Sequence, residues 1–199
     1  VVGIVLGVYI GTIVLLNIPS VQQVMSVFVA EELSDLLNTR VTIGRINIGL
    51  LNRIIIDDVL LDDQDEQEML KVTRLSAKFD IMPFFKGKIS ISSVQLFGFN
   101  INLQKKTPDS PPNFKFVLDA FASNDTVKKD NSLDLRINSI LIRRGRMAYH
   151  VLSEEETPGK FNAKHIHLQN IIANISLKAL SKDSINLGIK RLSLDEKVS

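Results

Sequence analysis

One eight-residue pattern of apolar and polar positions recurs along the chain. Two apolar residues flank one other residue, two polar or small residues follow, and the apolar pair then repeats. The clearest copy is ISISSVQL, residues 89–96, in which Ser92 and Ser93 interrupt the alternation. Chance would give about two such matches at average apolar content, whereas the chain holds seven. The other copies are VTIGRINI (41–48), IIIDDVLL (54–61), LKVTRLSA (70–77), LRINSILI (135–142), IHLQNIIA (166–173) and LGIKRLSL (187–194).

Each copy predicts a β-strand with a break near its middle. Strict alternation of apolar and polar residues places the apolar side chains on one face of a sheet. At the serine pair the apolar phase slips by one residue, as it does at a β-bulge or a sharp strand bend. We therefore predict a mostly β protein whose repeated strands form a curved antiparallel β-groove, or β-taco, with one inserted helix.

The predicted strands fall into two groove segments, residues 40–104 and 133–199, on either side of a proline-rich loop. That loop, residues 105–132, contains three of the six prolines and an amphipathic helix at 113–122, which Asn113 is expected to cap. Residues 143–146 are expected to form a turn, and the acidic run 62–68 a solvated hairpin tip. The expected strands are 41–48, 54–61, 70–81, 89–103, 133–142, 147–152, 161–168, 171–179 and 185–194.

The first 18 residues carry no charge and are dominated by aliphatic side chains. A helix of this length covers about 27 Å, which is close to the hydrocarbon thickness of a bilayer. No small-x-small cleavage site follows, so residues 1–18 are predicted to be an uncleaved transmembrane anchor rather than a signal peptide. The expected anchor residues are Val1, Val2, Ile4, Val5, Leu6, Val8, Ile10, Ile13, Val14, Leu15 and Leu16.

Residues 19–39 are predicted to form a juxtamembrane amphipathic helix. It should begin at Ser20, with Gln23 completing a capping box, and end near Asn38, which tolerates a left-handed conformation. Its apolar stripe is expected to cover the end of the following sheet, and contact with a lipid surface is the alternative. The stripe consists of Val21, Val24, Phe28, Leu33, Leu36 and Leu37.

Composition argues against several classes of function. A net charge of +2 is too small for a nucleic-acid-binding footprint, and the absence of cysteine excludes disulfides and thiolate zinc sites. His165 and His167 would share one strand face as a possible metal pair, but no third ligand is suggested nearby and His150 stands alone. Because no phosphate-binding loop or catalytic motif is present, we expect a protein that is not an enzyme and uses no cofactor.

Three runs, at residues 54–56, 96–99 and 140–142, place apolar side chains on both faces of a strand. An antiparallel sheet with one wet face does not require this, so either both faces are covered or one face lines an apolar cavity. Such a cavity could hold acyl chains by area burial alone, at about 0.8 kcal/mol per methylene. A register error of one residue would reverse the choice of face. The residues expected to line the lipid groove are Ile46, Ile48, Ile54, Ile56, Val59, Leu61, Leu75, Phe79, Ile91, Val94, Leu96, Ile140 and Ile142.

The order of these parts resembles the N-terminal region of TamB-type proteins, which belong to the AsmA-like superfamily of Gram-negative bacteria. The resemblance rests on the membrane helix, on the following proline and amphipathic helix, and on the strings IGRINI, IIIDDVLLDDQ and ISSVQLFG. In addition, the string PNFKFVLDAF matches the helix that interrupts the strands in the Bacteroidota branch. It implies a single-pass inner-membrane protein whose β body lies in the periplasm and carries phospholipid towards the outer membrane or supports outer-membrane protein assembly. It also implies a BamA- or TamA-type barrel partner, met through a C-terminal domain that this chain does not contain.

Two functions therefore remain open at the level of sequence. In the first, the membrane-anchored β-groove is a conduit for phospholipid. In the second, it is a tethered structural scaffold that positions assembly partners and carries no lipid. The sequence alone leaves open the lipid, the direction of transport and the strand face that looks inward.

Overall fold

The computed structural model describes residues 2–49, 52–79, 89–123, 133–134, 139–180 and 185–196, and it is mostly β. A helix lies where residues 113–122 were predicted to form one, with α4 at Lys115–Ser123. The helices and strands are α1 (Val2–Leu16), α2 (Pro19–Leu37), β1 (Val41–Gly49), β2 (Arg53–Asp62), β3 (Glu68–Phe79), β4 (Ile89–Lys105), α4 (Lys115–Ser123), β5 (Leu133–Asp134), β6 (Ser139–Val151), β7 (His165–Leu180) and β8 (Ile185–Glu196).

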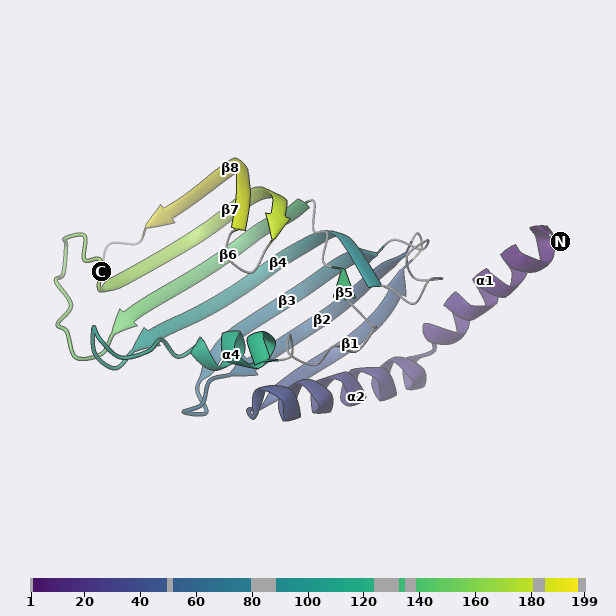
Figure 1. Ribbon diagram of the computed structural model, residues 1–199, viewed down its shortest axis with the longest axis horizontal. Coiled ribbons are helices and arrows are strands. Elements are labelled where there is room, and N and C mark those ends of the chain that lie inside the picture. Colours follow the sequence, from purple (N-terminus) through teal and green to yellow (C-terminus); the bar gives the residue numbers. More distant parts are fainter. Residues whose placement is uncertain are drawn as a thin grey trace.

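One mixed sheet contains all the described strands, in the order β1-β2-β3-β4-β6-β7-β8, with β5 paired to β4 (Figure 1). The antiparallel prediction holds for every neighbouring pair along this order except β4 and β6, which run parallel. Parallel strands need a long crossover, whereas antiparallel neighbours can be joined by a tight turn. The chain between β4 and β6, which includes α4, supplies that crossover.

Strands β6 and β7 are longer than the sequence pattern predicted. Residues 143–146, predicted as a turn, lie inside β6, and residues 169–170 lie inside β7. The pairing between the two strands shifts register on both sides of Gly145. Arg144 and Asn170 take up these irregularities with positive φ angles of 55° and 53°. Within Ser139–Val151 and His165–Leu180 the two predicted strands are therefore one strand with a bulge, because the kink does not break the hydrogen-bonded ladder, whereas residues 133–134 form the separate strand β5 and residues 161–164 precede β7.

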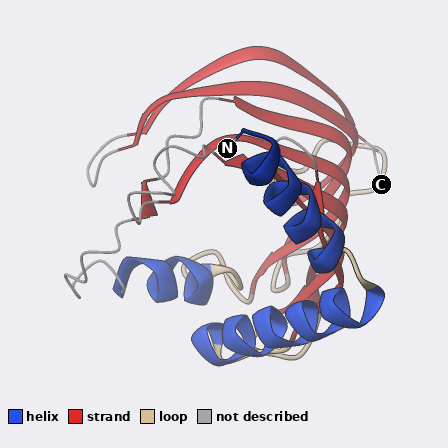
Figure 2. Cartoon of the chain, turned by 90° about the vertical axis from the view of Figure 1, so that its right-hand side faces the viewer, coloured by secondary structure: helices blue, strands red, loops and turns tan. Residues whose placement is uncertain are grey.

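The sheet curves, and α2 and α4 lie on its concave side (Figure 2), whereas α1 extends beyond the end of the sheet (Figure 1). A buried cluster joins Leu37 at the end of α2 to Val41, Leu61 and Met69 at the adjoining ends of the first three strands. Apolar residues of α4 and the turn before it pack against the same cluster, namely Phe114, Phe116, Val117 and Ala120. Asn113 does not cap α4 in the predicted way. Its amide oxygen instead accepts the backbone N–H of Gln104 at 3.0 Å, which attaches the start of the helix to β4.

Helix α2 packs along β1 mainly with small and polar residues, and only the end of the predicted apolar stripe faces the sheet, where Leu37 is buried and Leu33 packs against the same cluster. Gln22, Ser26, Ala30 and Leu37 are its buried residues. The Gln22 side chain donates to Asn47 Oδ1 at 2.7 Å. The opposite side of the helix exposes Val24, Val27, Phe28 and Leu36. Val24, Phe28 and Leu36 of the predicted apolar stripe are therefore turned away from the sheet.

The ends of α2 agree only in part with the predicted capping. Asn38 closes the helix in the left-handed conformation, with a φ of 49°, as predicted. At the other end the helix begins at Pro19 with Ile18 as its N-cap, so the predicted capping box at Ser20 is absent. Proline is favoured at this first position because its missing N–H has no helical partner there.

Helix α1 covers 15 residues and exposes most of the described anchor side chains. Within the described residues, no single helix has both the length and the apolar character needed to cross a bilayer. The bent pair Gly7–Leu16 and Pro19–Leu37, which meet at 69°, satisfies those criteria together. The bend is attached to the sheet by Asn17, whose amide donates to the carbonyl oxygen of Ile48 at 2.8 Å.

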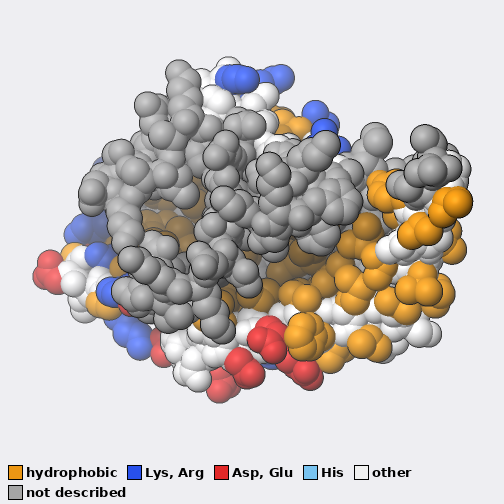
Figure 3. Space-filling view, turned by 45° about the vertical axis from the view of Figure 1, so that its right-hand side comes forward, with side chains coloured by type: hydrophobic (Ala, Val, Ile, Leu, Met, Phe, Trp, Pro, Cys, Tyr) orange, Lys and Arg blue, Asp and Glu red, His pale blue; other side chains and the backbone are white. Residues whose placement is uncertain are grey.

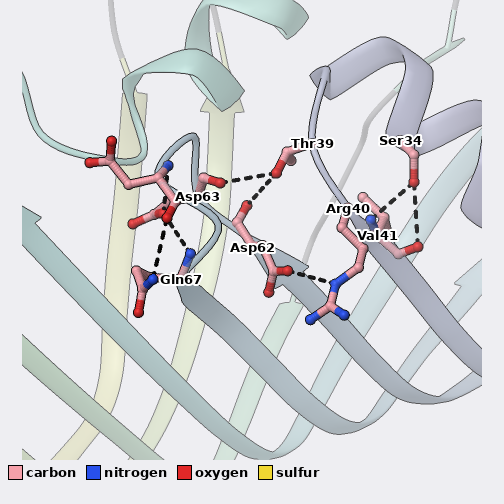
Figure 4. A network of polar contacts seen from close by, with 8 residues as sticks. Ser34, Thr39, Arg40, Val41, Asp62, Asp63 and Gln67 are labelled. Atoms are coloured by element: carbon pink, nitrogen blue, oxygen red, sulfur yellow. Dashed lines mark hydrogen bonds and ion pairs between the residues drawn. The ribbon is translucent and has the colours of Figure 1, made fainter.

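The acidic run 62–68 is not a fully solvated tip, since Asp62 and Asp63 are buried (Figure 4). Asp63 is 1% exposed, and its Oδ1 accepts the backbone N–H groups of Asp65 and Gln67, each at 3.0 Å. Asp62 pairs with Arg40 through Nε and Oδ2 at 2.7 Å. The Arg40–Asp62 pair joins the end of β2 to the turn between α2 and β1, whereas the bonds to Asp63 Oδ1 close the turn after β2.

Candidate functional site

The strand register places apolar side chains in rows that cross the whole sheet. Residues directly opposite each other in a ladder point to the same face, so each row belongs to one side. Three rows each contain an apolar residue from all or nearly all of the seven long strands. They are Ile48–Ile54–Ala77–Val94–Ile140–Ile175–Ile189, Ile46–Ile56–Leu75–Leu96–Ile142–Ala173–Leu192 and Val41–Leu61–Leu70–Ile101–Met147–Leu168.

All three rows lie on the concave side of the sheet. Leu70 of the third row packs against the buried cluster that the helices cover. It also packs against a second buried cluster formed by Val72, Phe99 and Ile171, which Leu75, Leu96 and Ile142 of the second row also contact. We call the surface formed by the three rows and this second cluster the concave apolar face. Figure 3 shows hydrophobic side chains gathered in the hollow beneath the curved sheet and continuing onto α1.

A kink at one level of the sheet allows both halves of each strand to contribute to the concave apolar face. Ile56 and Val59 are three residues apart and would face opposite sides in a regular strand. Between them, Asp58 has a φ of 55°, and Gly98 in β4 has a φ of 64°. Arg144 and Asn170 take the same conformation in β6 and β7. Asparagine and aspartate adopt it more readily than other side chains, and glycine does so without steric cost.

The predicted bulge at Ser92–Ser93 is confirmed, and it is a second break in β4. Lys78 pairs with Ser93, whereas the next residue of β3, Phe79, pairs with Ile91, so Ser92 is the extra residue. Its hydroxyl donates to the carbonyl oxygen of Lys78 at 3.3 Å. The bulge keeps Ile91 and Val94 on the same face.

All the predicted lining residues share the concave apolar face. Ile46 and Leu61 are buried, and the others are half-buried. The predicted lining left out several residues of the same face, of which Phe99, Ile101, Met147 and Ile175 lie beyond the repeated pattern and the others lie within its copies. The missed residues are Ile43, Val72, Ala77, Phe99, Ile101, Met147, Leu168, Ile171, Ala173, Ile175, Ile189 and Leu192.

The convex face is mainly polar and charged. One row runs through Arg45, Asp57, Arg74, Phe97 and Arg143, and Arg74 Nε lies 2.6 Å from Asp57 Oδ1. The runs that appeared apolar on both faces are explained by isolated apolar residues on this side. Ile55 stands between Asn47 and Ser76, and Leu141 pairs with Gln95 and Asn174.

The predicted anchor residues lie along α1, apart from Val1, which is outside the described residues. Ile4, Val8, Ile10, Val14 and Leu15 are between 49% and 72% exposed. Ile13 and Leu16 are half-buried, and Val2, Val5 and Leu6 belong to the helix without described side chains. The exposed apolar surface of α1 adjoins that of α2.

Gly145 is a point of close approach inside the concave apolar face. A Cβ at this position would lie 2.2 Å from Cζ of the buried Phe99 ring. We expect Gly145→Ala to lower the free energy of unfolding by about 1–3 kcal/mol, the usual range for overpacking a core. Thermal and urea denaturation measure the loss, and Phe99→Leu in the same chain should restore part of it. Equal effects of the single and double variants would show that the contact with Phe99 is not the cause.

The three histidines of the chain meet on the convex face at the β6–β7 end. His150 pairs with His165 in the ladder, and the two Nδ1 atoms are 3.1 Å apart. The His167 ring lies edge-on to His150, with centroids 4.8 Å apart. The sequence pattern placed His165 and His167 together but left His150 alone, because it could not show that the two strands are neighbours. Glu156 lies 3.9 Å from the Nδ1 atoms of His150 and His165, so these three residues could hold a metal ion.

Burial, reinforced by His167 and His165, lowers the pKa of His150 below its ordinary 6.5, although Glu156 opposes the shift. The unfolded chain then binds more protons than the folded one as pH falls through 6.5 towards the lowered pKa. We therefore expect the free energy of unfolding to decrease as pH falls through this window, and the decrease to be smaller in His150→Gln. Thermal denaturation in the presence of EDTA between pH 5 and 8 measures both slopes, and identical slopes would contradict the prediction.

Comparison with known proteins adds no functional assignment. No model of a known protein family matches the chain, and no functionally curated protein matches it.

Proposed function

We propose that the protein binds phospholipid acyl chains along the concave apolar face and carries them away from a membrane in which α1 is anchored. The observation that carries this proposal is the alignment of apolar residues from strand to strand across the sheet. A surface of this kind binds hydrocarbon chains through area burial and requires no polar constellation.

The shape of the molecule favours lipid over a folded protein partner as the occupant. Hydrophobic side chains gather in a hollow beneath the curved sheet (Figure 3), whereas a typical protein–protein interface is no more apolar than the rest of the protein surface. The apolar rows continue to β8, where Ile189 and Leu192 are 62% and 55% exposed. Lipid acyl chains that lie across the strands could therefore move from one apolar row to the next without leaving the apolar surface.

The helices supply the membrane contact in this proposal. Apolar side chains are exposed on α1 and on the outer side of α2, where Val24 and Phe28 are 69% and 61% exposed. Exposed apolar surface on two adjoining helices is typical of segments that lie in or on a bilayer. In a TamB-type protein of a Gram-negative cell envelope, the anchor would be in the inner membrane and the sheet in the periplasm, with a BamA- or TamA-type barrel as the distant partner.

The alternative is a tethered scaffold that carries no lipid. A site-specific photocrosslinking experiment separates the two functions. A benzophenone side chain at Leu96 faces the concave side, whereas the same group at the neighbouring Gln95 faces the convex side. After expression in a Gram-negative host and irradiation, the conduit predicts phospholipid adducts by mass spectrometry at Leu96 and few at Gln95. Equal yields at both positions, or protein adducts alone at Leu96, would favour the scaffold.

A further inference from the structure

We propose that His150, His165 and Glu156 form a binding site for a transition-metal ion, with Zn²⁺ as the best-suited ion. The site lies on the convex face, so it is separate from the concave apolar face and independent of the proposed lipid binding. It joins the last residues of β6, the first residue of β7 and the loop between them.

The hydrogen bonds of His165 prepare its Nδ1 for a metal. Nε2 of His165 lies 2.9 Å from the backbone carbonyl oxygen of Glu154, which can only accept, so Nε2 must carry the proton. In the neutral ring, Nδ1 then carries the lone pair. An imidazole that donates through one nitrogen to a carbonyl and offers the other to a metal is the usual arrangement in protein metal sites.

The spacing of the ligand atoms fits one small ion. Zinc bonds of about 2.0–2.1 Å to nitrogen in tetrahedral geometry place two nitrogens about 3.4 Å apart. The two Nδ1 atoms are 3.1 Å apart, and each is 3.9 Å from Glu156 Oε1. Because Glu156 is 52% exposed and belongs to a loop, its carboxylate can move the last few tenths of an ångström more easily than the ladder can. Three protein ligands leave a fourth position for water or for another protein.

The ligand types select the class of metal. Two imidazoles and one carboxylate suit Zn²⁺, Ni²⁺ or Cu²⁺, whereas Ca²⁺ and Mg²⁺ prefer sites made of oxygen ligands alone. His165 is 5% exposed and His150 is 26% exposed, so the site is anchored in the sheet and open to solvent on one side. A bound ion would tie the loop to the end of both strands.

The test uses the whole chain in detergent, purified without a polyhistidine tag and treated with EDTA. Isothermal titration with ZnCl₂ should give one site per chain, and a hundredfold excess over the Kd should raise the Tm by about 5–10 °C. Nitrogen-15 NMR of the histidine rings should show a zinc-dependent shift of Nδ1 at two histidines. MgCl₂ should cause neither change.

Glu156→Gln and Glu155→Gln form a matched pair at neighbouring exposed positions, and neither change should affect folding. Glu156→Gln should weaken Zn²⁺ binding at least about tenfold, whereas Glu155→Gln should leave the Kd unchanged. His165→Ala should remove binding. Equal affinities of the two glutamine variants, or no Zn²⁺ binding by the wild-type chain, would show that the two histidines form only a hydrogen bond and would overturn the proposal. Neither result would bear on lipid binding.

Discussion

If the proposed lipid binding is right, replacing Ile56 with aspartate should remove most of the phospholipid bound by the purified protein, whereas the same change at Ile55 should leave it bound. Ile56 lies in a concave row between Ile46 and Leu75, and Ile55 lies on the convex face between Asn47 and Ser76. An unpaired carboxylate among acyl chains costs several kcal/mol, because nothing there replaces its hydration. On the convex face the half-buried side chain at position 55 has the polar neighbours Asn47 and Ser76, which offer the carboxylate hydrogen-bonding partners.

Lipid mass spectrometry of the two purified variants measures the difference, with circular dichroism to verify that both are folded. Transfer of a labelled phospholipid between vesicles gives a second measurement, in which Ile56→Asp should be slow and Ile55→Asp close to wild type. Ile142→Asp and Leu141→Asp repeat the comparison in β6, where the two residues again face opposite sides. If the concave and convex variants retain equal amounts of lipid, the concave apolar face does not carry it.

The second large effect is expected at Asp63. Its carboxylate is 1% exposed and accepts four hydrogen bonds. Two come from backbone N–H groups of its own turn, and two come from the side chains of Gln104 and Asn113, at 3.1 and 3.0 Å. Asp63→Ala leaves these donors without the partner they share, and an unpaired buried donor costs about 1–3 kcal/mol. We expect the free energy of unfolding to fall by at least about 3 kcal/mol.

At about 2–4 °C per kcal/mol for a chain of this size, the Tm of Asp63→Ala should fall by about 6–12 °C. Asp65→Ala is the control, because Asp65 is half-exposed and its ion pair with Lys106 lies at the surface. Its Tm should stay within about 1–2 °C of the wild type. Equal Tm values for both variants would mean that the buried carboxylate does not join β2 to the α4 segment.

The sequence was sufficient to predict the repeated strands and the phase slip within them, because both are local properties. The pairs Asp57–Asp58 and Ser92–Ser93 interrupt the alternation where the structure has a kink and a bulge. The residues predicted to line the groove lie on one face of the sheet, because the register pairs them from strand to strand.

The remaining features depend on which strands become neighbours, and no local pattern contains that information. The parallel pairing of β4 with β6 requires a crossover connection between them. The prediction of an entirely antiparallel sheet, which assumed consecutive hairpins, was therefore wrong for this pair of strands. His150 acquired its partners only through the register of β6 against β7. Asp63 was mistaken for a solvated residue because its partners, Gln104 and Asn113, are 41 and 50 residues away in the chain.

The kink that crosses the sheet at one level restricts how the strands can change in length during evolution. Asp58 in β2 and Gly98 in β4 each divide a strand into two halves, and the apolar side chains of both halves lie on the concave face. Removing one residue from such a half would turn its remaining side chains to the opposite face, whereas removing two would preserve their facing. Insertions and deletions that related proteins accept within these strands should therefore occur in pairs, while single-residue changes should be confined to the loops.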